Sequence, residues 1–113
     1  GHGGVVAYLG THDMKAVEEE IHQGNEEFRL IYEGMAYQVA KEIGASAAVL
    51  QGNVDVICLT GGLAASEMMT DWIRQRVEWI APVKVYPGEE EMEALALGAL
   101  RVLKGQEEAK EYA

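Results

Sequence analysis

The chain has 113 residues, of which 49% are hydrophobic, and its 9 Lys and Arg residues against 19 Asp and Glu residues give a net charge of −10. That length fits a single domain with its own core, and the acidity argues against nucleic acid or an anionic membrane surface as a partner, because both attract basic faces. The single cysteine, Cys58, forms no internal disulfide and suits a reducing cytoplasm, and no apolar run approaches the roughly 18 residues of a membrane span.

The first half of the chain predicts one strand and two helices. Residues 5–9 (VVAYL) form a short apolar run between glycines, which is typical of a buried strand. After it, Asp13 is placed to cap a short helix. From residue 26 to about residue 49 apolar side chains recur at three- and four-residue steps, which predicts a long helix. Gly34 and Gly44 each cost about 1 kcal/mol relative to alanine inside this helix, so we interpret them as points of close packing on another element.

The second half predicts two more strands, each followed by a helix. Residues 56–59 (VICL) form a buried strand, the Gly61-Gly62 pair turns the backbone, and a helix starts near Ser66. Residues 83–86 form a third strand. A last helix then begins among glutamates, and its apolar stripe consists of Met92, Leu95, Ala96, Ala99, Leu100 and Leu103. The predicted order is β-α-α-β-α-β-α, an α/β fold with a mostly parallel short sheet covered by helices.

Three polar, glycine-containing loops follow the three strands, at residues 10–13, 60–63 and 87–90. Open α/β sheets bind ligands beyond the carboxyl ends of their strands, so parallel strands would bring these loops to one edge. Carboxylates at Asp13 and among residues 89–91 could hold a ribose or the water shell of an ion. The alternative needs no ligand, because Asp13 can serve as a helix cap and the glutamates can complement a helix dipole.

Other chemistries find little support in the sequence. The glycine pair lacks the lysine and spacing of a phosphate loop, and no serine stands between glycines as in a nucleophile elbow. The histidines show no zinc-ligand spacing with Cys58. We interpret Ser66 as a helix cap, and Trp72 and Trp79, two helical turns apart, as core or interface residues.

Three segments carry a family resemblance. Residues 3–13 (GGVVAYLGTHD), 59–64 (LTGGLA) and 86–96 (YPGEEEMEALA) resemble, in this order, the C-terminal part of the butyrate kinases. These belong to the acetate kinase family, within the actin-like ATPase and sugar-kinase superfamily. The resemblance implies part of an actin-like ATPase (ribonuclease H-like) domain over residues 1–113. It also implies phosphorylation of a short-chain carboxylate by ATP with Mg²⁺.

The resemblance also implies where the nucleotide lies. Asp13, Met14 and Lys15 match a motif that lines the adenosine pocket, although related kinases usually have arginine at the position of Lys15. Lysine keeps the charge but loses the planar fork of a guanidinium, which weakens the expectation of stacking or bidentate contact there.

Two further matches concern the nucleotide loop and the metal. The residues that match the loop under the nucleotide are Gly61, Gly62 and Leu63. Glu90 is the nearest match to the acidic residue that serves the metal, with Glu89 and Glu91 as alternatives. None of the matched residues is catalytic.

The same resemblance implies that another half of the enzyme carries the first phosphate loop, the carboxylate pocket and the phosphate-stabilising arginines. In the parent sheet two further strands lie between the first two strands of this chain. Without them we expect either open apolar surface or strands that close up. We therefore predict a fragment that contributes the adenosine side of the site, is inactive alone, and works with the missing half or a second copy. The alternative is a ligand-free structural module that self-associates through strand edges and the Trp72 and Trp79 face.

Overall fold

The computed structural model describes residues 3–87 and 100–103. The elements, in chain order, are β1 (Gly4–Tyr8), α1 (Lys15–His22), α2 (Glu26–Val49), β2 (Val56–Thr60), the 3₁₀-helix η1 (Gly62–Ala65), α3 (Glu67–Val77), β3 (Val83–Tyr86) and β4 (Leu100–Leu103). The α/β fold class is confirmed, and so is the order β-α-α-β-α-β as far as residue 87. This is the arrangement expected for part of an actin-like ATPase domain.

The four strands form one parallel sheet in the order β3-β2-β1-β4. β1 lies directly beside β2, with Val5 opposite Ile57 and Ala7 opposite Leu59. Of the two expectations for this part of the sheet, the strands therefore close up. Closing up pairs the N–H and C=O groups that an interior strand edge would otherwise leave unpaired.

The end of the chain departs from the sequence prediction. Leu100 and Leu103 were expected on the stripe of a helix, but residues Leu100–Leu103 form β4, which pairs with β1 so that Gly4 lies opposite Leu100. An open edge of β1 offers a row of backbone partners, and a short apolar run can fill it as a strand. The other stripe residues, Met92, Leu95, Ala96 and Ala99, lie outside the described residues.

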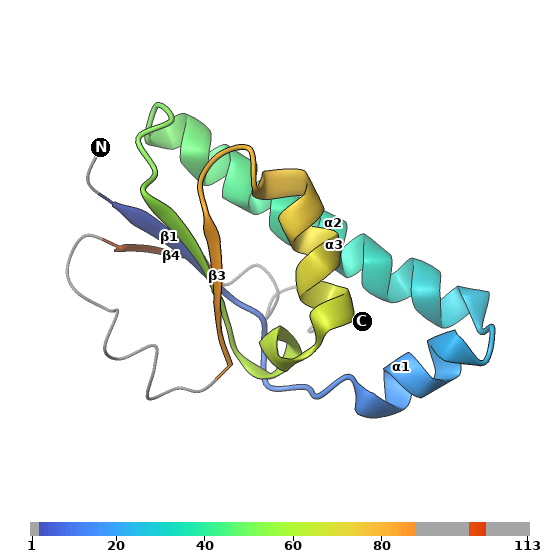
Figure 1. Ribbon diagram of the computed structural model, residues 1–113. Coiled ribbons are helices and arrows are strands. Elements are labelled where there is room, and N and C mark those ends of the chain that lie inside the picture. The colour runs from blue at the N-terminus through green and yellow to red at the C-terminus, as the bar shows by residue number, and fades with distance from the viewer. Residues whose placement is uncertain (1–2, 88–99, 104–113) are drawn as a thin grey trace.

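The core lies between the sheet and the two longer helices, α2 and α3 (Figure 1). Side chains from β1 and β2 that point toward the helices, such as Val5 and Leu59, pack in one cluster with Ile43 of α2 and with Met69 and Ile73 of α3. All five are buried. Fully burying a side chain of this size contributes roughly 1.5–3 kcal/mol, so this cluster fixes the helices on the sheet.

Both long helices begin at side-chain caps. The Asn25 side chain accepts a hydrogen bond from the backbone N–H of Phe28 (3.2 Å), and the Ser66 hydroxyl accepts one from the N–H of Met69 (3.1 Å). Each bond satisfies one of the N–H groups that a helix start leaves without an internal partner. The predicted role of Ser66 as a cap is confirmed.

One sequence interpretation of helix packing is wrong, and a second holds only for Trp72. Gly34 and Gly44 do not mark close packing, because a Cβ built on either meets no atom within 4 Å. Trp72 and Trp79 do not share a helix face, because α3 ends at Val77. Trp72 packs half-buried against the core, whereas Trp79 is exposed. In the described part of the chain, no helix combines the length and the hydropathy needed to cross a bilayer.

Candidate functional site at the carboxyl edge of the sheet

The loops after β1 and β2 meet at the same edge of the sheet. Because the two strands are parallel, both loops leave their carboxyl ends (Figure 1). The N–H of Leu9 donates to the carbonyl of Thr60 (2.7 Å), and the N–H of Gly62 donates to the carbonyl of Gly10. The predicted convergence of these two corners is confirmed. The third loop begins at Pro87, and its residues from 88 on lie outside the described part.

The glycine pair makes this contact possible. Gly61 has a φ of +98°, and a Cβ built on it would lie 2.6 Å from the carbonyl oxygen of Gly10. A Cβ on Gly62 would lie 2.5 Å from the carbonyl oxygens of Thr11 and His12. Only glycine allows two backbones to approach this closely. The pair therefore brings the two loops together, whatever else it does.

Asp13 and Lys15 lie at the start of α1, beside this contact. The Asp13 carboxylate accepts a hydrogen bond from the backbone N–H of Lys15 (2.7 Å), and both residues are exposed. The backbone places the cap position one residue later than expected, at Met14, which makes no side-chain cap bond. Asp13 nevertheless satisfies the first N–H of the helix, as a cap does. A carboxylate and an ammonium group thus stand on the solvent side of the β1 loop.

Met14 and Leu63 differ from the other predicted site residues. Both side chains are buried in the core cluster. Met14 anchors the β1 loop and Leu63 anchors η1. Their side chains therefore hold the two loops on the core. Glu90 and its alternatives, Glu89 and Glu91, lie outside the described residues.

Comparison with known families decides what kind of protein this is. Residues 2–86 match the acetokinase family, and this range includes both loops. The chain belongs to the acetokinase family. Members of the family are carboxylate kinases that use ATP and Mg²⁺, so the two touching loops lie in a chain of a nucleotide-binding kinase family. The matched range ends before Glu90.

A cavity of about 520 Å³ opens on the other side of η1, between this 3₁₀-helix, the first turns of α3 and the end of β3. Its described lining residues are Ala64, Ala65, Glu67, Thr70, Asp71, Arg74, Val85 and Pro87. Arg74 is bound to Asp71 (2.8 Å) there. None of these residues is among the site residues predicted from the sequence of this acetokinase-family chain. Their three- and four-residue spacing after the Ser66 cap could have indicated a shared helix face at the edge of the sheet.

The described residues of this acetokinase-family chain bring together no ligand set of a metal ion. Within residues 3–87 and 100–103, no three His, Cys, Asp or Glu side chains are grouped so that they could hold a metal ion.

Proposed function

We propose that this chain forms the adenosine side of the nucleotide site in a butyrate kinase-like enzyme, which transfers a phosphoryl group from ATP to a short-chain carboxylate. The observation that carries the proposal is the direct contact of the β1 and β2 loops at the carboxyl edge. This is where open parallel sheets bind nucleotides, and both loops lie within the range that matches the acetokinase family.

The side chains at this edge suit a nucleoside better than a transferring phosphate. The Asp13 carboxylate can accept hydrogen bonds from ribose hydroxyls, and Lys15 supplies one cation beside it. Lysine is a point charge without the flat fork of arginine, so we assign it an electrostatic contact rather than stacking. Gly61 and Gly62 let the backbones of the two loops touch, and we assign this backbone contact to the floor of the site.

The chemistry itself needs groups beyond these. In the proposed reaction a carboxylate oxygen attacks the γ-phosphorus, the bond to the β-phosphate oxygen breaks, and ADP and an acyl phosphate leave. Such a transfer depends on positioning and on neutralising the phosphate charges. Mg²⁺, when bound, supplies part of that neutralisation, and we keep Glu90 as its proposed ligand. Of the described cations near this edge, Arg74 is already paired with Asp71. We therefore assign phosphoryl transfer to the other half of the enzyme and expect this chain alone to be inactive.

Calorimetric titration with MgADP and MgATP tests the nucleotide assignment. We expect weak binding by the chain, and at least about a fivefold loss in each of two variants. Asp13→Asn removes the negative charge and replaces one acceptor oxygen by a donor amide, and Lys15→Ala removes the ammonium group. Asp55→Asn and Lys84→Ala are matched controls: Asp55 precedes β2 at the opposite edge, Lys84 lies within β3, and both are exposed. Equal losses in all four variants, or no binding at millimolar nucleotide, would contradict the assignment.

An activity assay tests the expectation that this chain alone does not catalyse phosphoryl transfer. The chain is incubated with ATP, Mg²⁺ and butyrate, and acyl phosphate is trapped with hydroxylamine. We expect no product, because the proposed phosphate-stabilising groups lie elsewhere. Butyrate-dependent turnover by this chain would show that it contains them.

The second candidate function is a structural module that self-associates without a ligand. The observation in its favour is the exposed apolar surface around α2. A nucleotide-dependent heat of binding would exclude this candidate as the sole function. In either case, the single buried thiol of Cys58 suits a reducing, cytoplasmic setting.

A further inference from the structure

Arg76, in the last turn of α3, has no acidic partner among the described residues. Its guanidinium carbon lies 4.9 Å from the centre of the Tyr37 ring on α2. This distance is within the reach of a cation–π contact, which holds the flat face of the guanidinium and leaves its N–H edge for an acceptor. Arg29 and Arg74, by contrast, are bound to carboxylates on their own helices.

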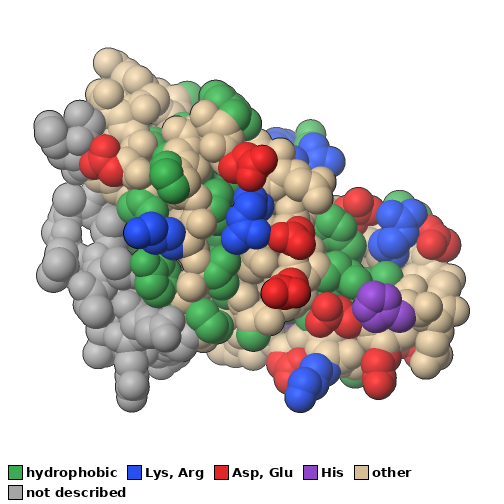
Figure 2. All heavy atoms as spheres, in the orientation of Figure 1, with side chains coloured by type: hydrophobic (Ala, Val, Ile, Leu, Met, Phe, Trp, Pro, Cys, Tyr) green, Lys and Arg blue, Asp and Glu red, His purple; other side chains and the backbone are tan. Residues whose placement is uncertain are grey.

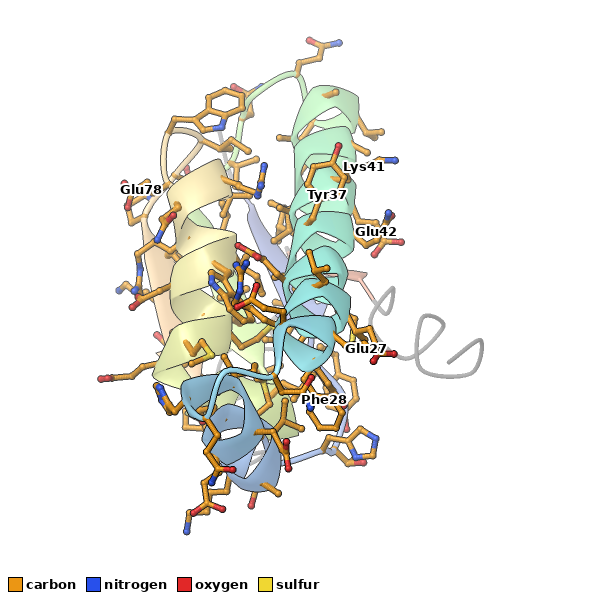
Figure 3. The ribbon with its side chains drawn as sticks, turned by 90° about the vertical axis from the view of Figure 1, so that its right-hand side faces the viewer. Glu27, Phe28, Tyr37, Lys41, Glu42 and Glu78 are labelled. Atoms are coloured by element: carbon orange, nitrogen blue, oxygen red, sulfur yellow. The ribbon has the colours of Figure 1, made fainter. Side chains whose placement is uncertain are left out.

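Arg76 lines the basic end of a groove between α2 and the turn after α3. This end has a volume of about 190 Å³ and is lined by Tyr37, Ala40, Lys41, Gly44, Arg76, Val77, Trp79 and Ile80. Two of these described residues are cations and none is acidic. Figure 3 shows Tyr37 on the viewer's side of α2 and Glu78 on the side of α3 away from α2. On a chain with a net charge of −10, this end of the groove is a local site for an anion.

The groove continues from its basic end into an apolar arm. The arm has a volume of about 380 Å³ and is lined by Gly44, Ala47, Ala48, Gly52, Trp79 and Ile80, three of which also line the basic end. A Cβ built on Gly44 meets no atom within 4 Å, so open space at this glycine joins the two parts. The Trp79 indole N–H donates to the carbonyl of Arg76 (2.8 Å) and needs no acceptor from a ligand. The arm therefore suits a part of a ligand that has no hydrogen-bonding groups.

A basic end and an apolar arm together match a carboxylate with an alkyl chain. A guanidinium binds a carboxylate through two parallel N–H···O bonds, and Lys41 adds a second positive charge at the same end. From Lys41 to Ala48 the groove follows α2 for about 10 Å, at a helix rise of about 1.5 Å per residue, which suits the extended chain of octanoate. Volumes of this size are typical of small-molecule sites, so we assign the groove to a small carboxylate rather than to a peptide segment.

We propose that this groove binds a medium-chain alkyl carboxylate, with the head group on Arg76 and the alkyl chain between Trp79 and the small residues of α2. The site lies away from the nucleotide edge and does not depend on the proposed function. The acid that reacts is assigned to the other half of the enzyme, so a carboxylate bound here is not the one that is phosphorylated.

NMR titration of the isotope-labelled chain with octanoate tests the proposal. We expect the indole N–H of Trp79 and the amides of Gly44 and Ala48 to shift together and to saturate at millimolar octanoate. Octanol has the same alkyl chain without the charge. At equal concentration we expect it to give shifts at least about fivefold smaller, because the charge-assisted bonds to Arg76 are lost.

Two pairs of variants test the two parts of the groove. Arg76→Gln removes the cation and should weaken octanoate binding at least about tenfold, whereas Arg29→Gln removes an arginine elsewhere, on α2, and leaves binding unchanged. Gly44→Leu fills the apolar arm and abolishes the shifts. Gly34→Leu makes the same exchange at another α2 glycine with open space around it, outside the groove lining, and leaves binding unchanged. Circular dichroism establishes that all four variants are folded.

Several results would overturn the assignment. Octanoate that shifts none of these signals does so, as does octanol that binds as tightly as octanoate, or Gly34→Leu that weakens binding as much as Gly44→Leu. Trp79 signals that respond to the concentration of the chain and not to octanoate would give the groove to a second copy. A peptide with a carboxyl-terminal leucine that binds more tightly than octanoate would give it to a protein terminus instead.

Discussion

At the scale of single residues, Gly61 has a backbone conformation and a close contact that both call for glycine. Its φ of +98° lies in the left-handed region, and the carbonyl of Gly10 occupies the space that a side chain would need. Gly24 has a nearly identical φ of +95°, but nothing lies within 4 Å of a Cβ there. A side chain at Gly24 would therefore meet only backbone strain, whereas one at Gly61 would meet the same strain and a steric clash.

We expect Gly61→Ala to lower the free energy of unfolding more than Gly24→Ala does, by about 1–3 kcal/mol, because overpacking adds to the same backbone strain. Urea denaturation of both variants measures the difference. Equal losses would mean that the β1 and β2 loops do not touch as described.

Burial changes the ionisation of the Cys58 thiol. It lies in β2 between Val6 of β1 and Lys84 of β3. Burial raises the pKa of its thiol above the ordinary value of 9.0, and the positive charge of Lys84 offsets only part of that rise. The thiol is therefore neutral and shielded near neutral pH.

We expect native Cys58 to resist a thiol-specific reagent at pH 8 and to react at once in urea. The raised pKa also means that the unfolded thiol ionises first as pH rises, so its contribution to stability is present below about pH 9 and is lost above it. The stability difference between the unmodified chain and Cys58→Ala should accordingly shrink between pH 8 and pH 10. A constant difference would contradict the raised pKa.

At the scale of elements, α2 shows that a glycine inside a helix need not signal packing. Gly44 sits in helical backbone and Gly52 has a φ of +80°, yet neither has an atom within 4 Å of a Cβ. Alanine at Gly44 gains helix propensity, whereas alanine at Gly52 is forced into a left-handed conformation.

We expect Gly44→Ala to raise the free energy of unfolding by about 0.5–1 kcal/mol and Gly52→Ala to lower it by about 1–2 kcal/mol. Urea denaturation of both variants measures the two changes. A loss of stability at Gly44 would indicate a packing constraint that the open space there does not reveal.

The exposed face of the molecule presents both signs of charge. In the view of Figure 2, acidic side chains outnumber basic ones, and lysine or arginine lies close to several of them. Arg29 bonds Glu26 and Glu33 on α2, and Arg74 bonds Asp71 on α3, each pair within one helix. Such exposed pairs contribute little to stability individually. The helices are instead held on the sheet by the buried cluster.

At the scale of the whole molecule, the order β3-β2-β1-β4 determines which strands are protected. β1 and β2 each have a strand on both sides, and β3 pairs only with β2 among the described strands. Amides bonded on an interior strand exchange only when larger parts of the structure open.

We expect the slowest amide hydrogen exchange in β1 and β2, at rates that follow global unfolding, and faster exchange in β3. Hydrogen exchange followed by NMR resolves the three strands. Protection of β3 beyond that of β1 would contradict the strand order, because it would require a further partner on the outer edge of β3.

Much of the fold could be predicted from the sequence because its signals are local. Helical periodicity marked α2, a serine marked the start of α3, and a glycine pair after an apolar run marked the loop after β2. Residues 3–13 and 59–64 also carried the resemblance that the acetokinase family match supports. All of these depend on neighbours within a few positions along the chain.

Only the tertiary structure decided how distant segments meet. Nothing in the sequence stated that β1 pairs directly with β2, that residues 100–103 continue the sheet, or that Met14 and Leu63 turn into the core. Local periodicity cannot report which strand edge is free or which space is already filled. Those outcomes are set by the need to pair backbone groups and bury apolar surface across the whole chain at once.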